Sequence, residues 1–168
     1  MWSFRGQQRP DFAVEPGPGQ ESVWDYPRPP ALAASNKQVV VMDGDALLAD
    51  TRRAMRVLET ASPPTYYLPP EDVDFTRLID APGSSFCEWK GRANYYALAT
   101  GGGVVAWQYR EPSEAFAAIT GYLSFYPAKL LCTVDGERVR PQPGDFYGGW
   151  ITDEITGPFK GEPGTGHW

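Results

Sequence analysis

Residues 92–110, RANYYALATGGGVVAWQYR, hold the pattern that decides the fold of this chain. Arg92–Thr100 and Val104–Arg110 are rich in aromatic and β-branched side chains, which fit the pleated surface of a sheet. Gly101–Gly103 lies between them, and glycine gives the backbone the freedom that a tight reversal needs. The stretch therefore predicts an antiparallel β-hairpin.

The same kind of pattern occurs on both sides of this stretch, with a different turn. Residues 37–50 carry Asp43-Gly44 near their centre, and residues 129–140 carry Asp135-Gly136. An Asp-Gly pair adopts the positive φ angles that a two-residue hairpin turn requires, and β-branched residues flank both pairs. Two further hairpins are therefore expected.

The remaining segments predict short elements. Pro112-Ser113-Glu114 predicts the start of one short helix that ends near Gly121, because proline suits the first helical position and glycine follows the last. Residues 51–59 predict one helical turn that leads into a strand, and residues 71–81 predict a short helical turn. Strands are also expected at residues 65–68 and 122–126.

The composition agrees with a mostly β chain and excludes several classes of protein. The 168 residues include 18 Gly and 17 Pro, which leaves little room for long helices. The net charge of −6 argues against a nucleic-acid-binding protein, since such proteins depend on clustered cations. His167 is the single histidine, so most imidazole-based chemistry is excluded.

The length predicts one domain, since domains usually contain roughly 100–200 residues. Residues 1–21 predict an N-terminal arm, because their Pro and Gly residues interrupt regular hydrogen bonding. Residues 22–140 predict the β-rich core domain. Residues 141–168 form a Gly/Pro/aromatic tail that we expect to pack on the core or on a partner. The triplet Trp89-Lys90-Gly91 is echoed at residues 159–161, but an echo this short arises by chance and indicates no repeat.

The cysteines and the apolar segments indicate the compartment. Cys87 and Cys132 are too far apart in the sequence for a paired C-x-x-C metal site. The longest apolar run, Val39–Met42, is far shorter than the roughly 20 residues of a membrane span. The first residues contain no apolar stretch typical of a secretory signal. We therefore expect a cytoplasmic protein with reduced thiols, no membrane association, no metal and no cofactor.

The motif CEWKGRANYY at residues 87–96 is the most specific of a set that runs through much of the chain. The others are SVWDYPRPP at 22–30, ADTRR at 49–53, YYLPPEDV at 66–73, WQY at 107–109 and FY at 125–126. In this order they resemble the family known as domain of unknown function 427, over roughly residues 22–127.

The resemblance implies a mostly β, β-tent-like fold, in which curved antiparallel sheets carry one short inserted helix. It is similar to the strand arrangement of certain zinc-carrying modules, but this chain has no four-cysteine set, so zinc is not implied. The tail after Arg140 looks like the longer form of the family. A nucleotidyltransferase-like label is attached to the family, yet Gly83-Ser84 follows Asp72 and Asp74 here, whereas the usual pattern places the Gly-Ser turn before its Asp pair.

Aromatic side chains with polar groups predict a ligand-binding site. Trp107 and Tyr109 share one face of a strand, whereas Tyr95 and Tyr96 point to opposite faces. A sheet curved around such rings would form a concave pocket for a small polar or anionic ligand, and an ordinary aromatic core is the alternative. The ligand-binding residues that we predict are Tyr26, Arg28, Tyr67, Lys90, Tyr96, Trp107 and Tyr109.

Two other functions stay open. Cys87 and Lys90 predict an enzyme, because an ammonium near a thiol favours the nucleophilic thiolate, although a small buried cysteine is the alternative. Glu59 and Asp72 are candidates for acid–base catalysis in such an enzyme. A third hypothesis is an interaction module that binds a protein partner, or a second copy of the chain, through its tail.

A separate group of cations is a further candidate. Arg52, Arg53 and Arg56 lie close together in the sequence, with Arg28 upstream. They predict a cationic patch on the surface, for which a solvated or ion-paired surface is the alternative.

Overall fold

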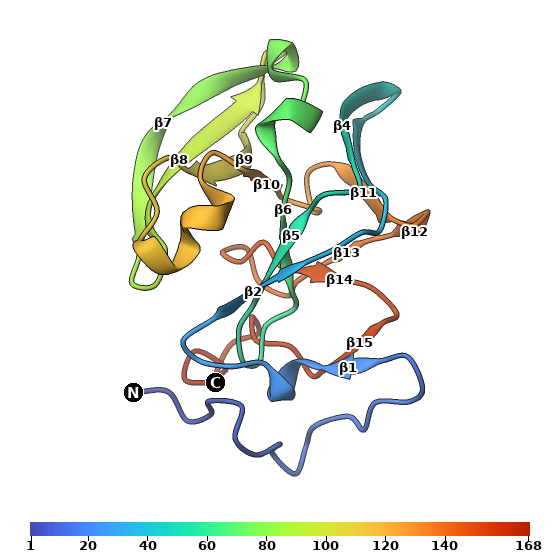
Figure 1. The fold of residues 1–168 in the computed structure, drawn as a ribbon, viewed down its shortest axis with the longest axis vertical. Helices are drawn as coiled ribbons and strands as arrows, with labels where there is room; N and C mark the ends of the chain where they lie inside the picture. The colour runs from blue at the N-terminus through green and yellow to red at the C-terminus, as the bar shows by residue number, and fades with distance from the viewer.

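The computed structural model describes residues 1–168, and the hairpin at residues 92–110 forms the centre of a four-stranded antiparallel sheet (Figure 1). Its strand order is β10-β9-β8-β7. Trp107 on β9 lies opposite Tyr95 on β8 and, on its other side, opposite Ser124 on β10. The strands are β7 (Leu78–Cys87), β8 (Gly91–Leu98), β9 (Val104–Tyr109) and β10 (Leu123–Phe125).

The sequence predicts a helical turn for residues 71–81, but the last part of this segment belongs to strand β7. Two 3-10 turns, η2 (Pro70–Asp72) and η3 (Phe75–Arg77), take up only the first part of that segment, and the chain then enters β7. Pro82-Gly83 does not end this strand. It is accommodated in a register shift between Ala81 and Ser84, and such irregularities are the places where sheets tolerate proline.

The two Asp-Gly hairpins lie side by side in a second four-stranded sheet of order β12-β11-β3-β4. Cys132 on β11 lies opposite Val41 on β3, so the two hairpins pair through their inner strands. Both predicted hairpins are therefore present. The strands are β3 (Val39–Asp43), β4 (Ala46–Thr51), β11 (Leu131–Val134) and β12 (Glu137–Arg138).

A three-stranded sheet of order β2-β5-β6 connects these two sheets. The helical turn predicted after residue 50 is absent, because β4 continues to Thr51. The Thr51 hydroxyl oxygen accepts a hydrogen bond from the Arg53 amide at 2.9 Å and donates to the Asp72 carboxylate at 2.7 Å, which stabilises a tight turn instead of a helix. The strands are β2 (Ala31–Ala34), β5 (Met55–Leu58) and β6 (Thr65–Tyr67).

The short inserted helix is a 3-10 helix, η4 (Glu114–Ile119), with a kink at Phe116. The predicted class, mostly β with antiparallel sheets and one short inserted helix, is confirmed, and the sheets do not close into a barrel. None of the helical segments is long and apolar enough to cross a membrane.

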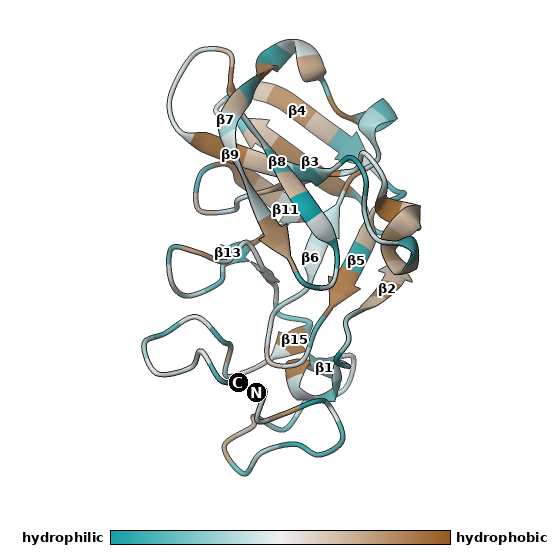
Figure 2. Cartoon of the chain, turned by 90° about the vertical axis from the view of Figure 1, so that its left-hand side faces the viewer, coloured by the Kyte–Doolittle hydropathy of each residue, from teal (hydrophilic) through white to brown (hydrophobic).

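Both ends of the chain lie at the same end of the molecule (Figures 1 and 2). The Ser3 amide donates a hydrogen bond to the His167 carbonyl at 2.9 Å. A parallel pair joins β1 (Glu21–Ser22) to β15 (Ile155–Thr156), and an antiparallel pair joins β13 (Arg140–Pro141) to β14 (Trp150–Ile151). A 3-10 turn, η1 (Val23–Asp25), follows β1.

The buried apolar side chains form three clusters. The largest, of 18 residues, includes side chains from both four-stranded sheets together with Trp150. A second cluster contains Tyr67, Trp107 and Tyr109, and a third forms around Trp24 near the chain ends. Hydrophobic stretches of β5 and β9 are visible in Figure 2. The second cluster forms the base of the site described next.

Candidate functional site

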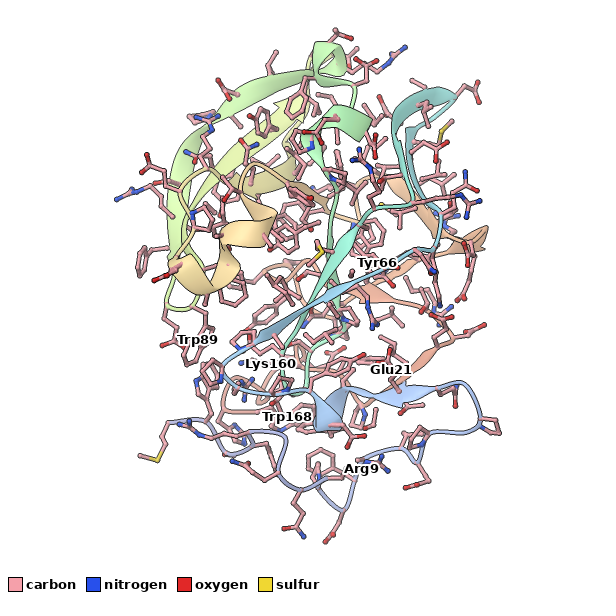
Figure 3. The ribbon with its side chains drawn as sticks, in the orientation of Figure 1. Arg9, Glu21, Tyr66, Trp89, Lys160 and Trp168 are labelled. Atoms are coloured by element: carbon pink, nitrogen blue, oxygen red, sulfur yellow. The ribbon has the colours of Figure 1, made fainter.

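A pocket of about 650 Å³ lies between β6, β8 and β9, the turn that joins β7 to β8, and parts of the arm and tail. In Figure 3, Trp89 lies in that turn and Lys160 lies close to it. Many of the lining side chains are aromatic, so a flat ligand would meet rings on several sides. The aromatic lining residues are Trp2, Tyr67, Phe86, Trp89, Tyr95, Trp107, Tyr109, Tyr126, Phe146 and Tyr147.

Six of the residues singled out in the sequence line this one pocket. They come from β6, the end of β7, the β7–β8 turn, β9 and the loop between β5 and β6, which are distant in the sequence. The pocket therefore combines candidates of both main hypotheses, ligand binding and catalysis. The six residues are Glu59, Tyr67, Cys87, Lys90, Trp107 and Tyr109.

Tyr26 and Arg28 were predicted in the pocket, but neither lines it. The Tyr26 ring is buried in the cluster around Trp24. The Arg28 guanidinium is buried and donates to the Glu59 carboxylate at 3.1 Å and to the Thr60 carbonyl at 3.0 Å. Arg28 therefore acts behind the pocket, because it holds Glu59 at the pocket wall.

Tyr96 also lies outside the pocket, and its neighbour Tyr95 takes the expected place. The β8–β9 pairing contains a register shift between Tyr96 and Ala97, close to the glycine turn. Tyr95 lies opposite Trp107, so these two side chains share a face. The Tyr96 hydroxyl donates to Gln108 at 2.8 Å on the other face.

Asp72 is separated from Glu59. Its carboxylate accepts hydrogen bonds from Thr51 at 2.7 Å and from Arg53 at 3.1 Å, and it does not line the pocket. The structure therefore does not bring Glu59 and Asp72 together as an acid–base pair. No group of three or more His, Cys, Asp or Glu side chains is arranged to hold a metal ion.

The central rings of the pocket are held in place by each other. The Trp107 indole N–H donates a hydrogen bond to the Tyr67 hydroxyl at 3.1 Å, and the centroids of Trp107 and Tyr126 are 4.6 Å apart. Burial raises the pKa of Tyr126 to about 12, and it also raises the pKa values of Tyr67 and Tyr109. All three hydroxyls are therefore protonated at neutral pH and can donate hydrogen bonds.

Lys90 provides one positive charge in the pocket. Its ammonium lies 5.8 Å from the centroid of the Tyr109 ring, within the range of a cation–π contact. Burial alone would lower the pKa of Lys90, but Tyr67, Cys87 and Glu59 together raise it above its ordinary value. Lys90 is therefore charged at neutral pH.

Lys160 provides a second positive charge from the tail. Only 4% of its surface is exposed, and its ammonium lies 4.1 Å from the centroid of the Trp2 ring. Burial and the charge of Arg28 lower the pKa of Lys160. Neither Lys90 nor Lys160 belongs to any ion pair of the structure. Glu59 lines the same pocket and its charge acts on both lysines, but neither ammonium is in contact with a carboxylate. A bound anion in contact with them would offset the cost of removing these charges from water.

Sequence reasoning missed Lys160 and Trp2 as parts of the pocket, because they lie in the tail and the arm. One signal was present in the sequence. The triplet of an aromatic residue, Lys and Gly occurs at residues 89–91 and again at 159–161, and the lysines of both triplets line the pocket. The contact of Trp2 with the pocket has no such local signal.

Comparisons with known proteins give the family of the chain. No curated protein matches this sequence. One family model, described as a domain of unknown function (DUF427), matches residues 31–140. The match includes β2–β12, and with them every pocket residue except those of the arm and the tail. Since it covers about two thirds of the 168 residues, the chain belongs to the DUF427 family.

Proposed function

We propose that this protein binds a small anionic ligand with an aromatic or apolar body in the pocket between β8, β9 and the tail. The observation that carries the proposal is the pair Lys90 and Lys160. Both ammonium groups line an aromatic pocket, and neither has a carboxylate partner.

The two parts of the pocket suit the two parts of such a ligand. Tyr95, Trp107 and Tyr126 provide ring faces and edges for an apolar body. Lys90 and Lys160 attract the anionic group, and charged hydrogen bonds are the stronger kind. The Tyr67 hydroxyl accepts from Trp107 and keeps its own proton to donate.

The first test uses two probes of the same shape and different charge, 2-naphthalenesulfonate and the neutral 2-naphthalenemethanol. We expect calorimetric titration to show that the full chain binds the sulfonate more tightly. In Lys160→Met the sulfonate affinity should fall about tenfold, the effect of losing one charged hydrogen bond. The affinity for the neutral alcohol should change little, because Met keeps the apolar stem.

The matched control is Lys129→Met, which removes an exposed lysine outside the pocket and should leave both affinities unchanged. Because the pKa of Lys160 is lowered, sulfonate binding should weaken with rising pH earlier than an ordinary lysine would allow. Equal losses for the two probes in Lys160→Met, or no sulfonate binding by the unchanged protein, would contradict the proposal.

An enzyme that uses Cys87 is the second candidate, and one observation favours it. Cys87 lines the same pocket as Lys90, and it is one of the neighbours that raise the pKa of that lysine. A thiol beside an ammonium is the arrangement of a nucleophilic cysteine. Alkylation of the folded protein tests whether this thiol is open to reagents.

A further inference from the structure

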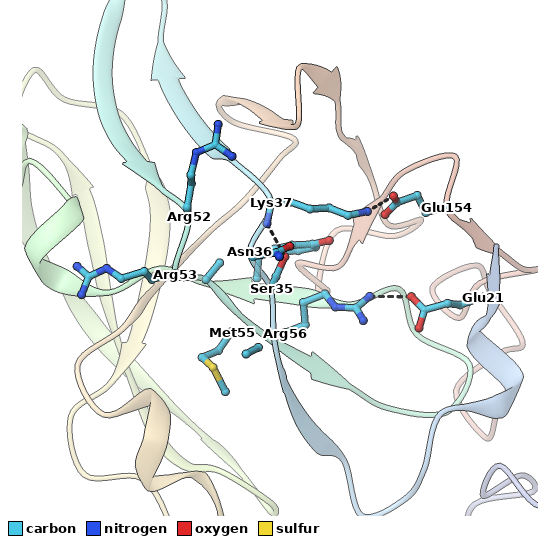
Figure 4. Close-up of a pocket in the computed structure, with 12 residues that line it drawn as sticks. Glu21, Ser35, Asn36, Lys37, Arg52, Arg53, Met55, Arg56 and Glu154 are labelled. Atoms are coloured by element: carbon cyan, nitrogen blue, oxygen red, sulfur yellow. Dashed lines mark hydrogen bonds and ion pairs between the residues drawn. The ribbon is translucent and has the colours of Figure 1, made fainter. Parts of the chain in front are cut away.

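A second pocket, of about 640 Å³, lies on the side of β2 and β5 that carries the arginine-rich segment (Figure 4). It is separate from the aromatic pocket, since the two share no lining residue. Tyr66, which is buried and stacked on Trp150 at a centroid distance of 5.0 Å, also lines it. The function proposed above does not use this second pocket.

The second pocket carries a positive charge in a protein whose net charge is −6. Its lining includes the two carboxylates Glu21 and Glu154. Four cationic side chains line it as well, and they come from the segment after β2, the β4–β5 turn and β5. These four are Lys37, Arg52, Arg53 and Arg56.

Two of the cations are held by carboxylates, one from Glu21 on β1 and one from Glu154 just before β15. Arg56 donates to Glu21 at 2.8 Å, and Lys37 forms a close ion pair with Glu154. Figure 4 shows these two ion pairs side by side. The Glu21 amide donates to the Glu154 carbonyl at 2.7 Å, so the two carboxylates are carried by adjacent backbone segments.

The other two cations differ from each other. Arg53 lines the pocket, but its guanidinium is bound to Asp72 at 3.1 Å. Arg52 is exposed and makes neither an ion pair nor a hydrogen bond. Figure 4 shows the Arg52 side chain extending away from Glu21 and Glu154. One guanidinium at this pocket is thus left without an anion.

We propose that this second pocket binds a phosphate-bearing small molecule through Arg52, Lys37 and Arg56. In the free protein Glu154 occupies Lys37 and Glu21 occupies one N–H group of Arg56. The phosphate group would replace the Glu154 carboxylate, and Arg56 would bind it through its remaining N–H donors. A guanidinium binds phosphate through paired N–H donors, and an ammonium binds it as a point charge. A phosphate carries oxygens in several directions, so it can meet cations that come from different segments. A carboxylate presents only two oxygens in one plane.

The experiment titrates the full chain with inorganic pyrophosphate in a calorimeter at constant ionic strength, with inorganic phosphate as a second probe. We expect binding of pyrophosphate to be tighter than that of phosphate, because its larger charge can meet more of the cations. Arg52→Gln should weaken pyrophosphate binding about threefold to fivefold, as expected for the loss of one exposed ion pair. Arg52 is exposed, so this variant should keep the melting temperature of the unchanged protein.

Glu154→Gln provides a test in the opposite direction. Removal of this carboxylate frees Lys37, so pyrophosphate should bind about threefold more tightly. The gain should exceed that in Glu114→Gln, which removes an exposed carboxylate outside this pocket and so measures the effect of net charge alone. Weaker or unchanged binding in Glu154→Gln would overturn the proposed exchange of carboxylate for phosphate.

Arg92→Gln is the matched control, because Arg92 is an exposed arginine on β8 that does not line this pocket. Equal losses in Arg92→Gln and Arg52→Gln would show diffuse charge attraction and would overturn the site. Lys160→Met distinguishes the two pockets, since it should leave pyrophosphate binding unchanged. If it abolishes that binding, the phosphate lies in the aromatic pocket, and the second site is wrong.

Discussion

At the scale of single residues, the two cysteines show how position controls reactivity. Cys132 lies on β11 in the main core, where 1% of its surface is exposed, and burial raises its pKa to about 12. Cys87 is the last residue of β7, is partly exposed and lines the aromatic pocket. Since alkylating reagents attack the thiolate, the two thiols should differ strongly in reactivity.

We predict that iodoacetamide at neutral pH modifies Cys87 in the folded protein and leaves Cys132 unmodified until the protein unfolds. Mass spectrometry of the intact protein should show one adduct without urea and two in concentrated urea. Cys87→Ser is the control and should give no adduct in the folded state. 2-Naphthalenesulfonate should slow the labelling, because ligand and reagent share one pocket. Rapid labelling of Cys132 in the folded state would contradict this assignment.

The aromatic residues of β8 and β9 show how far the site could be predicted from the sequence. The alternation along β9 correctly places Trp107 and Tyr109 on one face. It cannot choose between Tyr95 and Tyr96, because a shift of one residue in the pairing reverses the faces of a strand. That shift lies between Tyr96 and Ala97, and no residue type there identifies it.

At the scale of elements, the hairpins were predictable because their signals are local. Each Asp-Gly turn and the glycine turn carry their own backbone requirement. Strands β2 and β7 were missed because their pairing depends on distant partners and Pro82 interrupts β7. Tertiary pairing overrides local propensity at such places.

The glycine turn between β8 and β9 gives a prediction at this scale. Gly102 has a φ of +101°, whereas Gly103 has an ordinary φ, and both have open space around them. Gly102→Ala should lower the free energy of unfolding by about 1–2 kcal/mol, since an L side chain is strained at such a φ. Gly103→Ala should change it by at most about 0.5 kcal/mol. Urea unfolding of both variants measures the difference, and equal effects would refute the assigned turn geometry.

At the scale of the whole molecule, the tail is part of the same structure as the predicted core segment. Trp150 has no exposed surface, and its indole N–H donates to the Phe125 carbonyl at 2.9 Å. The same tail brings Lys160 into the aromatic pocket and Glu154 into the second pocket. The Gly and Pro residues of the tail indicate that its backbone is irregular, but they do not indicate which residues of the core the tail packs against. For this reason, the sequence could not assign Lys160 to a site.

The last prediction concerns this dependence on the tail. A chain that ends at Arg140 lacks Trp150, and loss of a buried Trp side chain alone costs about 3–5 kcal/mol. Domains of this size are stabilised by only about 5–15 kcal/mol, and the truncation also removes Ile155 and the β1–β15 pairing. We therefore expect the truncated chain to lose cooperative thermal unfolding and binding of 2-naphthalenesulfonate. Phe146→Ala, which alters a tail side chain that is 80% exposed, is the control and should unfold cooperatively near the temperature of the unchanged protein. If the truncated chain unfolds cooperatively at that temperature, the tail is an appendage, and Trp150 does not support the core in the way that its burial implies.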